Sequence, residues 1–290
     1  MQNIEFDEYV GVDWSGAKSP KKSFSISLAS CFSGQTDAPS ARLEKLSRTD
    51  IFDFIKARLS TTSRTLIGID CNFGYCAEVM RRQFGKDVSY LDLHKAVEQM
   101  NLEHPNFFAG NFWSCKPYVN DFWTTGKQPQ WFCAKSLRRH TETASIEQGL
   151  GIPESPFKLI GAKQVGKGGL AGMRMLRQLK MLYPDTLALW PFDGQKIHDA
   201  RVVVTEIYPR LFIKKAGFGN QKVRDLPTLN EVLSNFDSGS LKLEAELNDH
   251  LSDAIIASAA LRWFCQNRHP LSLRMPHEAK KLEGWIFGVE

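Results

Sequence analysis

Residues 10–13 read Val-Gly-Val-Asp, and residues 67–70 repeat the arrangement as Ile-Gly-Ile-Asp. Each stretch is a short apolar run that ends in an aspartate, a pattern typical of a buried strand. Side chains alternate between the two faces of a strand, so each glycine lies on the same face as the acid two residues later. Both stretches therefore predict a strand with a carboxylate at its carboxyl end and cleared space beside that carboxylate.

A third strand is predicted to end in an acid as well. Residues 202–206 read Val-Val-Val-Thr-Glu, and such a β-branched run is typical of a strand covered on both faces. Glu206 shares its face of the strand with the apolar Val202 and Val204. Its carboxylate is therefore expected in apolar surroundings.

The fourth acid lies on a predicted helix over residues 248–265. This helix is apolar on nearly every side, so it is expected to pack deep in the protein. At 100° per residue, Asp253 aligns with the small Ala257 and Ala260. These alanines predict that the helix approaches a sheet closely and carries the carboxylate with it.

Clustered buried carboxylates require cations. Taken singly, Asp13, Asp70, Glu206 and Asp253 are each more typical of a turn residue or a helix cap, but all four stand in apolar contexts. A buried carboxylate without compensation costs several kcal/mol. Magnesium and manganese take oxygen ligands, and two such ions about 4 Å apart clamp the attacking and leaving oxygens of a phosphoryl displacement. The four acids together therefore favour a site for Mg²⁺ or Mn²⁺.

The periodicity of apolar residues predicts an α/β fold with a large insertion. The first seventy residues are expected in the order β-β-β-α-β, with strands over 9–13, 23–28 and 41–46, a helix over 47–59 capped by Thr49 or Asp50, and a strand over 65–70. Later elements are a helix over 170–182 and strands over 187–190 and 201–208. We expect residues 1–70 and 185–290 to form a core with a mixed central sheet flanked by helices, and residues 71–184 to form a helical, aromatic-rich insertion.

Composition places the chain in the ordinary globular class. Of its 290 residues, 42% are hydrophobic and 24% charged, and the formal net charge of +5 permits a polyanionic partner without requiring one. The six cysteines include no C-x-x-C pair, so neither a disulfide framework nor a zinc site is expected. No apolar run is long enough for a membrane span, and Glu5, Asp7 and Glu8 stand where a signal peptide carries positive charge. These features predict a cytoplasmic protein without membrane contact, and they leave its oligomeric state open.

The insertion contains nine aromatic residues among the 26 from Phe107 to Phe132. They are expected either to form a small aromatic core or, with neighbouring lysines, to form a platform on which unpaired bases stack. The residues predicted to contact such a substrate are Lys18, Arg138, Arg139, Lys163, Lys167, Trp113 and Trp123. Gly166-Lys167-Gly168-Gly169 lacks the full spacing of a phosphate-binding loop.

The predicted element order, closed by a helix that bears the last acid, resembles the ribonuclease H-like fold. It is closest to the Holliday-junction-resolvase branch, whose closing helix carries an H/D-x-x-D-A sequence, here residues 250–254. Five short motifs in order also resemble the family named as domain of unknown function 429, which is predicted to be a ribonuclease H-like nuclease. The motifs are G-V-D-W-S-G (11–16), G-I-D-C-N-F-G (68–74), T-E-I-Y-P (205–209), D-A-I-I-A-S-A-A (253–260) and E-G-W-I (283–286).

The resemblance implies metal-binding and catalytic roles for the four acids, with Asp249 or His250 as a further ligand. The function expected on this basis is a Mg²⁺- or Mn²⁺-dependent nuclease that hydrolyses phosphodiesters of nucleic acid at a two-metal carboxylate site. One alternative is an actin-like or sugar-kinase-like phosphotransferase, because residues 13–16 (Asp-Trp-Ser-Gly) faintly resemble a phosphate loop of that fold. Another is a non-catalytic nucleic-acid-binding or protein-binding module.

Overall fold

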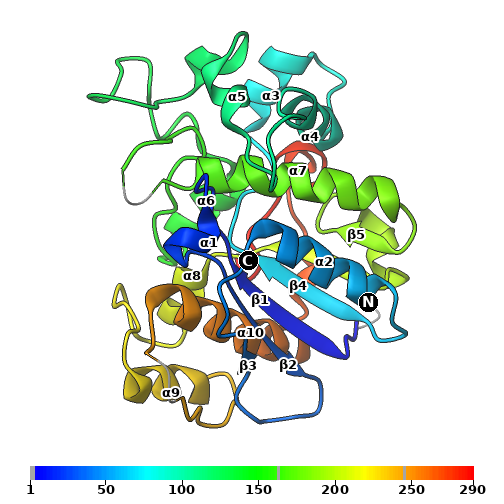
Figure 1. The fold of residues 1–290 in the computed structure, drawn as a ribbon, viewed down its shortest axis with the longest axis vertical. Coiled ribbons are helices and arrows are strands. Elements are labelled where there is room, and N and C mark those ends of the chain that lie inside the picture. The colour runs from blue at the N-terminus through cyan, green and yellow to red at the C-terminus, as the bar shows by residue number, and fades with distance from the viewer. Residues whose placement is uncertain (1–3, 162–163, 244–245) are drawn as a thin grey trace.

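The computed structural model describes residues 4–161, 164–243 and 246–290. A six-stranded sheet in the order β3-β2-β1-β4-β6-β5 forms the centre (Figure 1). The strands are β1 (Glu8–Asp13), β2 (Ser27–Phe32), β3 (Ser40–Ala41), β4 (Thr65–Ile69), β5 (Leu187–Leu189) and β6 (Val202–Glu206). β2 is antiparallel to β1 and β3, whereas β1, β4, β6 and β5 are mutually parallel. The expected α/β class with a mixed sheet is confirmed.

Helices cover both faces of this sheet (Figure 1). α10 (Asp249–Asn267) packs on one face, and α2 (Arg48–Leu59) and α7 (Gly166–Leu182) pack on the other. The remaining α-helices are α1 (Pro20–Ser23), α3 (Ala77–Phe84), α4 (Tyr90–Gln99), α5 (Gly110–Ser114), α6 (His140–Glu147), α8 (Pro209–Lys215) and α9 (Leu226–Ser234). Short helical turns are η1 (Tyr118–Asp121), η2 (Gly194–His198), η3 (Pro270–Ser272) and η4 (Ala279–Glu283). The sheet is thus the middle layer of three.

Alternation along the strands divides the core into two clusters. Tyr9 and Val203 belong to the cluster on the α10 face, whereas Val12, Ile69 and Val204 belong to the cluster under α2 and α7. Residues at even and odd positions of a strand therefore meet different helices. Whether a strand-terminal acid stands at an even or an odd position of its strand therefore decides on which side of the sheet its side chain lies.

α10 fits closely against β1 because both contribute small residues at the contact. A Cβ on Gly11 would lie 2.3 Å from the carbonyl oxygen of Ala254, and the Ser258 hydroxyl donates a 2.9 Å hydrogen bond to the carbonyl of Tyr9. Tyr9 thus lies opposite Ser258 and Gly11 opposite Ala254, so a step of two residues forward along β1 corresponds to a step of four residues backward along α10. Each step is about 6 Å long, and the two elements therefore run antiparallel. The next step in this series brings His250 over Asp13.

Three predicted elements are shifted. β2 lies four residues later than the expected strand over 23–28, because Pro20 starts a helical turn and Phe24 ends it in the left-handed conformation. β3 is shorter than the strand predicted over 41–46, and α7 begins at Gly166 rather than at residue 170. α7 also packs on the sheet through Met175 and Leu179, so it belongs at least in part to the core.

The insertion has a third hydrophobic cluster of its own. Phe112, Phe122 and Phe132 are buried in it together with Tyr75 and Phe157. Phe112 and Phe122 lie edge to face with ring centroids 6.1 Å apart, a favourable aromatic arrangement. For these rings the structure supports the interpretation as a small aromatic core. The insertion includes α3, α4 and α5, which lie on the side of α7 that faces away from the sheet (Figure 1).

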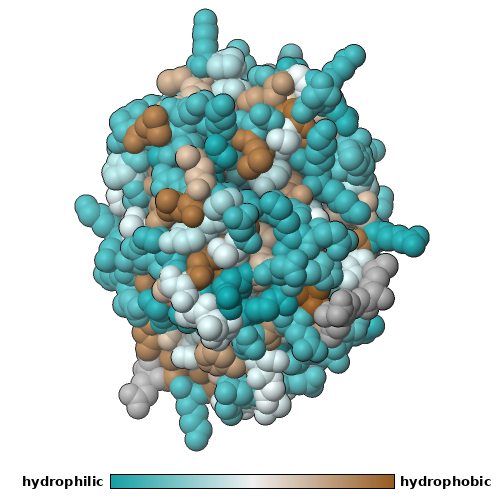
Figure 2. All heavy atoms as spheres, turned by 90° about the vertical axis from the view of Figure 1, so that its right-hand side faces the viewer, coloured by the Kyte–Doolittle hydropathy of each residue, from teal (hydrophilic) through white to brown (hydrophobic). Residues whose placement is uncertain are grey.

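The side of the molecule in Figure 2 is mainly hydrophilic. Figure 2 shows one side of the molecule, where hydrophobic residues form small areas separated by polar side chains, as is usual for a globular chain. Among the described residues, no helix has both the length and the apolar composition that crossing a membrane requires.

Candidate functional site

Strand register places Asp13 and Asp70 side by side at the carboxyl end of the sheet. Gly11 pairs with Gly68 and Val12 with Ile69 in the parallel β1–β4 ladder, and the Asp70 amide donates a 3.0 Å hydrogen bond to the Val12 carbonyl. The two aspartates follow at the next position, so both belong to the face that α10 covers. The sequence repeat Gly-x-Asp therefore corresponds to a real adjacency of two carboxylates.

The first turns of α10 bring Asp253 and His250 to the same place. His250 Nδ1 lies 2.7 Å from Oδ2 of the buried Asp13. The helix is capped by Asn248, whose side chain accepts a hydrogen bond from the amide of Leu251. A helix N-terminus carries partial positive charge and so favours nearby carboxylates. Asp13, Asp70 and Asp253 together are called the three-carboxylate site below.

Burial raises the pKa of each member of the three-carboxylate site. For Asp70, burial and then the charges of Asp13, Asp253 and Glu206 raise the pKa well above its usual range. Burial, with the charges of Asp13 and Asp249 adding to it, raises the pKa of Asp253 to about 8. Burial also raises the pKa of Asp13, against the hydrogen bond from His250. The charge of Asp13 thus acts on both Asp70 and Asp253, and the charge of Asp253 acts on Asp70.

Two of the three carboxylates lack a partner. Within the described part of the chain, the carboxylates of Asp70 and Asp253 accept no hydrogen bond and form no ion pair, whereas Asp13 has His250. A cavity of about 90 Å³ opens beside Asp253 and is also lined by Arg210. It has room for several water molecules. The donor set suits a hard divalent cation, although no three His, Cys, Asp or Glu side chains of residues 4–161, 164–243 and 246–290 are arranged to hold a metal as they stand.

Glu206 lies at the same end of the sheet but on the other face. The β4–β6 register pairs it with Ile69 and not with Asp70, so its side chain points with Val204 towards the α2 and α7 side. The expectation that Glu206 joins the other three acids in one metal site is therefore not met. The sequence predicted that Glu206 shares a face of its strand with Val204, but it did not predict how β6 is aligned with β4.

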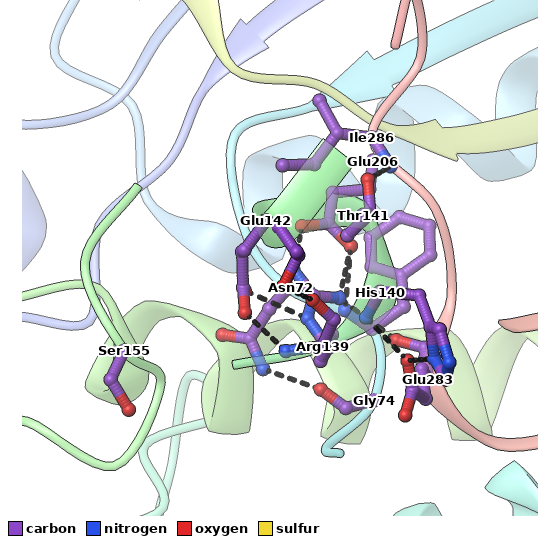
Figure 3. A network of polar contacts seen from close by, with 12 residues as sticks. Asn72, Gly74, Arg139, His140, Thr141, Glu142, Ser155, Glu206, Glu283 and Ile286 are labelled. Carbon is purple, nitrogen blue, oxygen red and sulfur yellow. Dashed lines mark hydrogen bonds and ion pairs between the residues drawn. The ribbon is translucent and has the colours of Figure 1, made fainter. Parts of the chain in front are cut away.

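A buried arginine neutralises Glu206. Arg139 Nη1 lies 2.7 Å from Oε2 of Glu206, and Nη2 lies 2.5 Å from Oε1, so the pair is bidentate (Figure 3). Arg139 is only 1% exposed, so it does not contact substrate as the sequence analysis expected. The physical reason is that buried carboxylates surround it, and a buried charge must be paired.

The same guanidinium ties together three distant segments of the chain. Its Nε lies 2.8 Å from Oε1 of Glu142, and Nη1 also donates to the Glu283 carbonyl (Figure 3). The Glu283 carboxylate in turn accepts 2.8 Å hydrogen bonds from the amides of Ala77 and His140. This network joins the insertion, the end of β6 and the E-G-W-I motif, and it gives that motif a structural role.

Gly284 allows the C-terminal segment to pass close to this ion pair. Its φ is +79°, and a Cβ there would lie 3.6 Å from both Arg139 Nη1 and Glu206 Oε2. Glu142 and Glu283 were not predicted from the sequence as members of the network. The signals that identify them are the Arg139–Glu142 spacing of three residues at a helix start, and the glycine that follows Glu283.

His250 rather than Asp249 adjoins the three-carboxylate site. Asp249 accepts two hydrogen bonds from Arg224 and pairs with Lys222, and these contacts hold the pKa of Asp249 well below its usual range. The hydrogen bond to Asp13 raises the pKa of His250. Of the two residues proposed as a further ligand, His250 is the one in contact with the site.

The residues predicted to contact substrate are distributed differently. Lys18 is exposed and Arg138 is half-buried, while Lys163 lies outside the described residues. Lys167 lies with its Nζ 5.8 Å from the ring centre of Trp113, and Lys167 also contacts Gly16 at the end of the loop after β1. Lys167 is therefore next to the loop that follows the strand carrying Asp13.

Trp123 belongs to the packing of the insertion. Its ring centre lies 5.2 Å from that of the buried Phe132, and the Lys158 ammonium lies 5.7 Å from the ring. It is partly buried, and its indole donates to the carbonyl of Gly126.

In comparisons with known proteins, no family model matches the chain, and no curated protein or solved structure matches it.

Proposed function

We propose that this protein has a ribonuclease H-like fold, is related to the family named as domain of unknown function 429, and acts as a metal-dependent nuclease. Support for the fold comes from three strands in antiparallel succession, then a helix, a parallel strand, two later parallel strands and a closing helix that bears an acid. Support for the activity comes from one observation above all: elements far apart in sequence bring three carboxylates together, and two of these carboxylates have no partner among the described residues.

The three-carboxylate site would hold Mg²⁺ or Mn²⁺. A bound divalent ion activates water and stabilises the leaving oxygen in phosphodiester hydrolysis. Asp70 and Asp253 offer carboxylate oxygens that no described residue engages, and His250 holds Asp13 in place through its 2.7 Å contact. The partial positive charge at the start of α10 lowers the cost of gathering these negative charges.

Nucleic acid is the substrate we propose. Lys167 adjoins the loop after β1, with its Nζ 5.8 Å from the ring centre of Trp113, and Lys18 is exposed in that loop. A lysine neutralises phosphate, and an aromatic ring stacks on an unpaired base. Together they suit a single-stranded segment that enters the site from the side of α7.

The kinase-like alternative receives less support. Gly16 has a packing role, because a Cβ there would lie 2.2 Å from the Lys167 carbonyl carbon, and the Trp14 indole donates to the Gly168 carbonyl at 2.9 Å. The loop after β1 is thus pressed against α7. A phosphate loop instead presents its backbone amides to a ligand.

Cleavage assays on the purified chain test this proposal. Labelled single-stranded and duplex DNA, RNA, and a small phosphodiester are incubated with Mn²⁺ or with chelator, and cleavage is expected with Mn²⁺ alone. Asp70→Asn should lower the rate at least about 100-fold. Asp249→Asn is the matched control, because its partners are the surface cations Lys222 and Arg224, and it should change the rate by less than about threefold.

Three outcomes distinguish the alternatives. Cleavage of the small ester but of no nucleic acid restricts the proposal to small phosphodiesters. Nucleic-acid binding without cleavage favours the non-catalytic module. Phosphate transfer from a nucleotide to an acceptor, with no hydrolysis of phosphodiesters, favours the phosphotransferase.

A further inference from the structure

Glu206 already has a cation that belongs to the chain. Both of its carboxylate oxygens contact the Arg139 guanidinium, at 2.7 and 2.5 Å, and the two residues are 3% and 1% exposed. Bidentate arginine–carboxylate pairs are among the strongest charge-assisted hydrogen bonds. A metal ion that bound Glu206 would displace the guanidinium and leave this buried cation with Glu142 in place of two carboxylate partners, and incomplete pairing of a buried charge costs stability.

The other contacts of Arg139 keep its charge in place. Nε donates to Glu142, and Nη1 donates to the Glu283 carbonyl as well as to Glu206. Burial opposes the charged form of Arg139, but the carboxylates of Glu142 and Glu206 outweigh that effect and raise its pKa. The guanidinium is therefore a permanent part of this side of the sheet.

Glu206 is also connected to the three-carboxylate site through the backbone. Its Oε2 accepts a 3.3 Å hydrogen bond from the Phe73 amide, in the buried loop of residues 71–74 that directly follows Asp70. The carbonyl of Phe73 lies 2.7 Å from Nε2 of the buried His94. Glu206 and His94 thus bind the amide and the carbonyl of Phe73, three residues after Asp70.

We infer that Glu206 is a positioning residue for Asp70, that Arg139 is its resident counter-ion, and that Glu206 is not a metal ligand. The metal is held by the three-carboxylate site on the opposite face. This inference rests on the proposed function, because it concerns how that site is assembled. It follows the general behaviour of metal sites, in which groups behind the ligands orient them and strongly affect affinity.

The possible roles of Glu206 are distinguished by the Mn²⁺ affinities of two variants, Glu206→Gln and Glu206→Ala. Binding is followed by the electron paramagnetic resonance signal of free Mn²⁺, with folding checked by circular dichroism. Glu206→Gln keeps an oxygen that accepts from Phe73, so the affinity should stay within about threefold of the unsubstituted chain. Glu206→Ala removes that acceptor, so the affinity should fall about tenfold. Asp70→Asn should lower it further still, and Glu142→Gln, which removes a charge from the same guanidinium, should match Glu206→Gln.

Each other outcome overturns the inference. If Glu206→Gln and Glu206→Ala both lose as much affinity as Asp70→Asn, Glu206 is a ligand. If Glu206→Ala melts at lower temperature but keeps full affinity, the role of Glu206 is only structural. A chain that binds no Mn²⁺ at all removes the proposed function and this inference together, which distinguishes that failure from the first two.

A second measurement applies if Glu206→Ala does not fold. A crystal structure of the unsubstituted chain with Mn²⁺ should show Glu206 still paired with Arg139 while the ion contacts the three-carboxylate site. An ion coordinated by Glu206 would overturn the inference.

Discussion

Asp253 makes the stability of the metal-free protein depend on pH. Its pKa is about 8 in the folded chain because of burial and the charges of Asp13 and Asp249, against about 3.9 in an unfolded chain. The folded state therefore holds a proton between these values that the unfolded state has lost. This contribution to stability is complete below about pH 4 and disappears as the pH rises through about 8.

In chelator, the free energy of unfolding should therefore fall from pH 5 to pH 8, by at most about 1.4 kcal/mol per pH unit for this one group. Urea unfolding at the two pH values measures it. Asp253→Asn should flatten the slope, and the shift of Asp70 in the same direction should leave a remainder. An equal slope in both proteins would contradict the shift assigned to Asp253.

The positions of some site residues could be predicted from the sequence and those of others could not. Asp13 and Asp70 were predictable as neighbours, because two strands with the same Gly-x-Asp ending become adjacent when they pair in parallel. Glu206 was not predictable in the same way, since a register shift of one residue moves a side chain to the opposite face. The burial of Arg139 depends on Glu206 and Glu142 meeting around it, and only the folded chain brings them together.

At the scale of elements, the contact between β1 and α10 depends on the absence of a side chain at Gly11. A methyl group there would lie 2.3 Å from the Ala254 carbonyl and 2.7 Å from the Ser258 amide, both backbone atoms that cannot move alone. Gly11→Ala should therefore lower the free energy of unfolding by about 1 to 3 kcal/mol, the usual cost of overpacking.

Gly168→Ala is the matched control for that substitution. It lies inside α7, where the nearest atom to an added Cβ is 3.6 Å away, so it should be neutral or stabilise by about 0.5 to 1 kcal/mol. Chemical denaturation of both variants measures the difference. Equal effects at the two positions would show that α10 can move away from β1.

Local patterns predicted some elements and failed for others. The elements that were predicted correctly are apolar nearly throughout and are buried on both sides, so their sequences allow only one assignment of secondary structure. They are β1, β4, β6 and α10. β2 was misplaced because Phe24, Ile26 and Leu28 alternate like a strand, whereas pairing along the whole of β1 selects a later segment. α8 and α9 were not predicted.

For the whole molecule, the balance of charge at the three-carboxylate site predicts a response to metal. Ions that bind only the folded state raise its stability by mass action, by about 2.7 kcal/mol at a concentration 100 times the dissociation constant. The melting temperature should rise with millimolar Mn²⁺. The rise should disappear in Asp70→Asn, and at high pH in chelator, where the carboxylates ionise and repel one another, this variant should melt higher than the unsubstituted chain.

Differential scanning calorimetry with and without chelator measures both effects. Asp249→Asn serves again as the control, since its carboxylate is engaged by Arg224, and it should retain the rise. A melting temperature that is indifferent to Mn²⁺ in every variant would count against a preformed site.

The seating of α10 on β1 also governs how the chain is made. Tyr9 and Ser258, joined by a hydrogen bond, are 249 residues apart, so the central strand leaves the ribosome long before the helix that covers it. At about 5 to 20 residues per second, that interval lasts tens of seconds. During it, the apolar side chains that β1 presents to α10 have no helix over them, and a cell that makes this protein must protect them until α10 arrives.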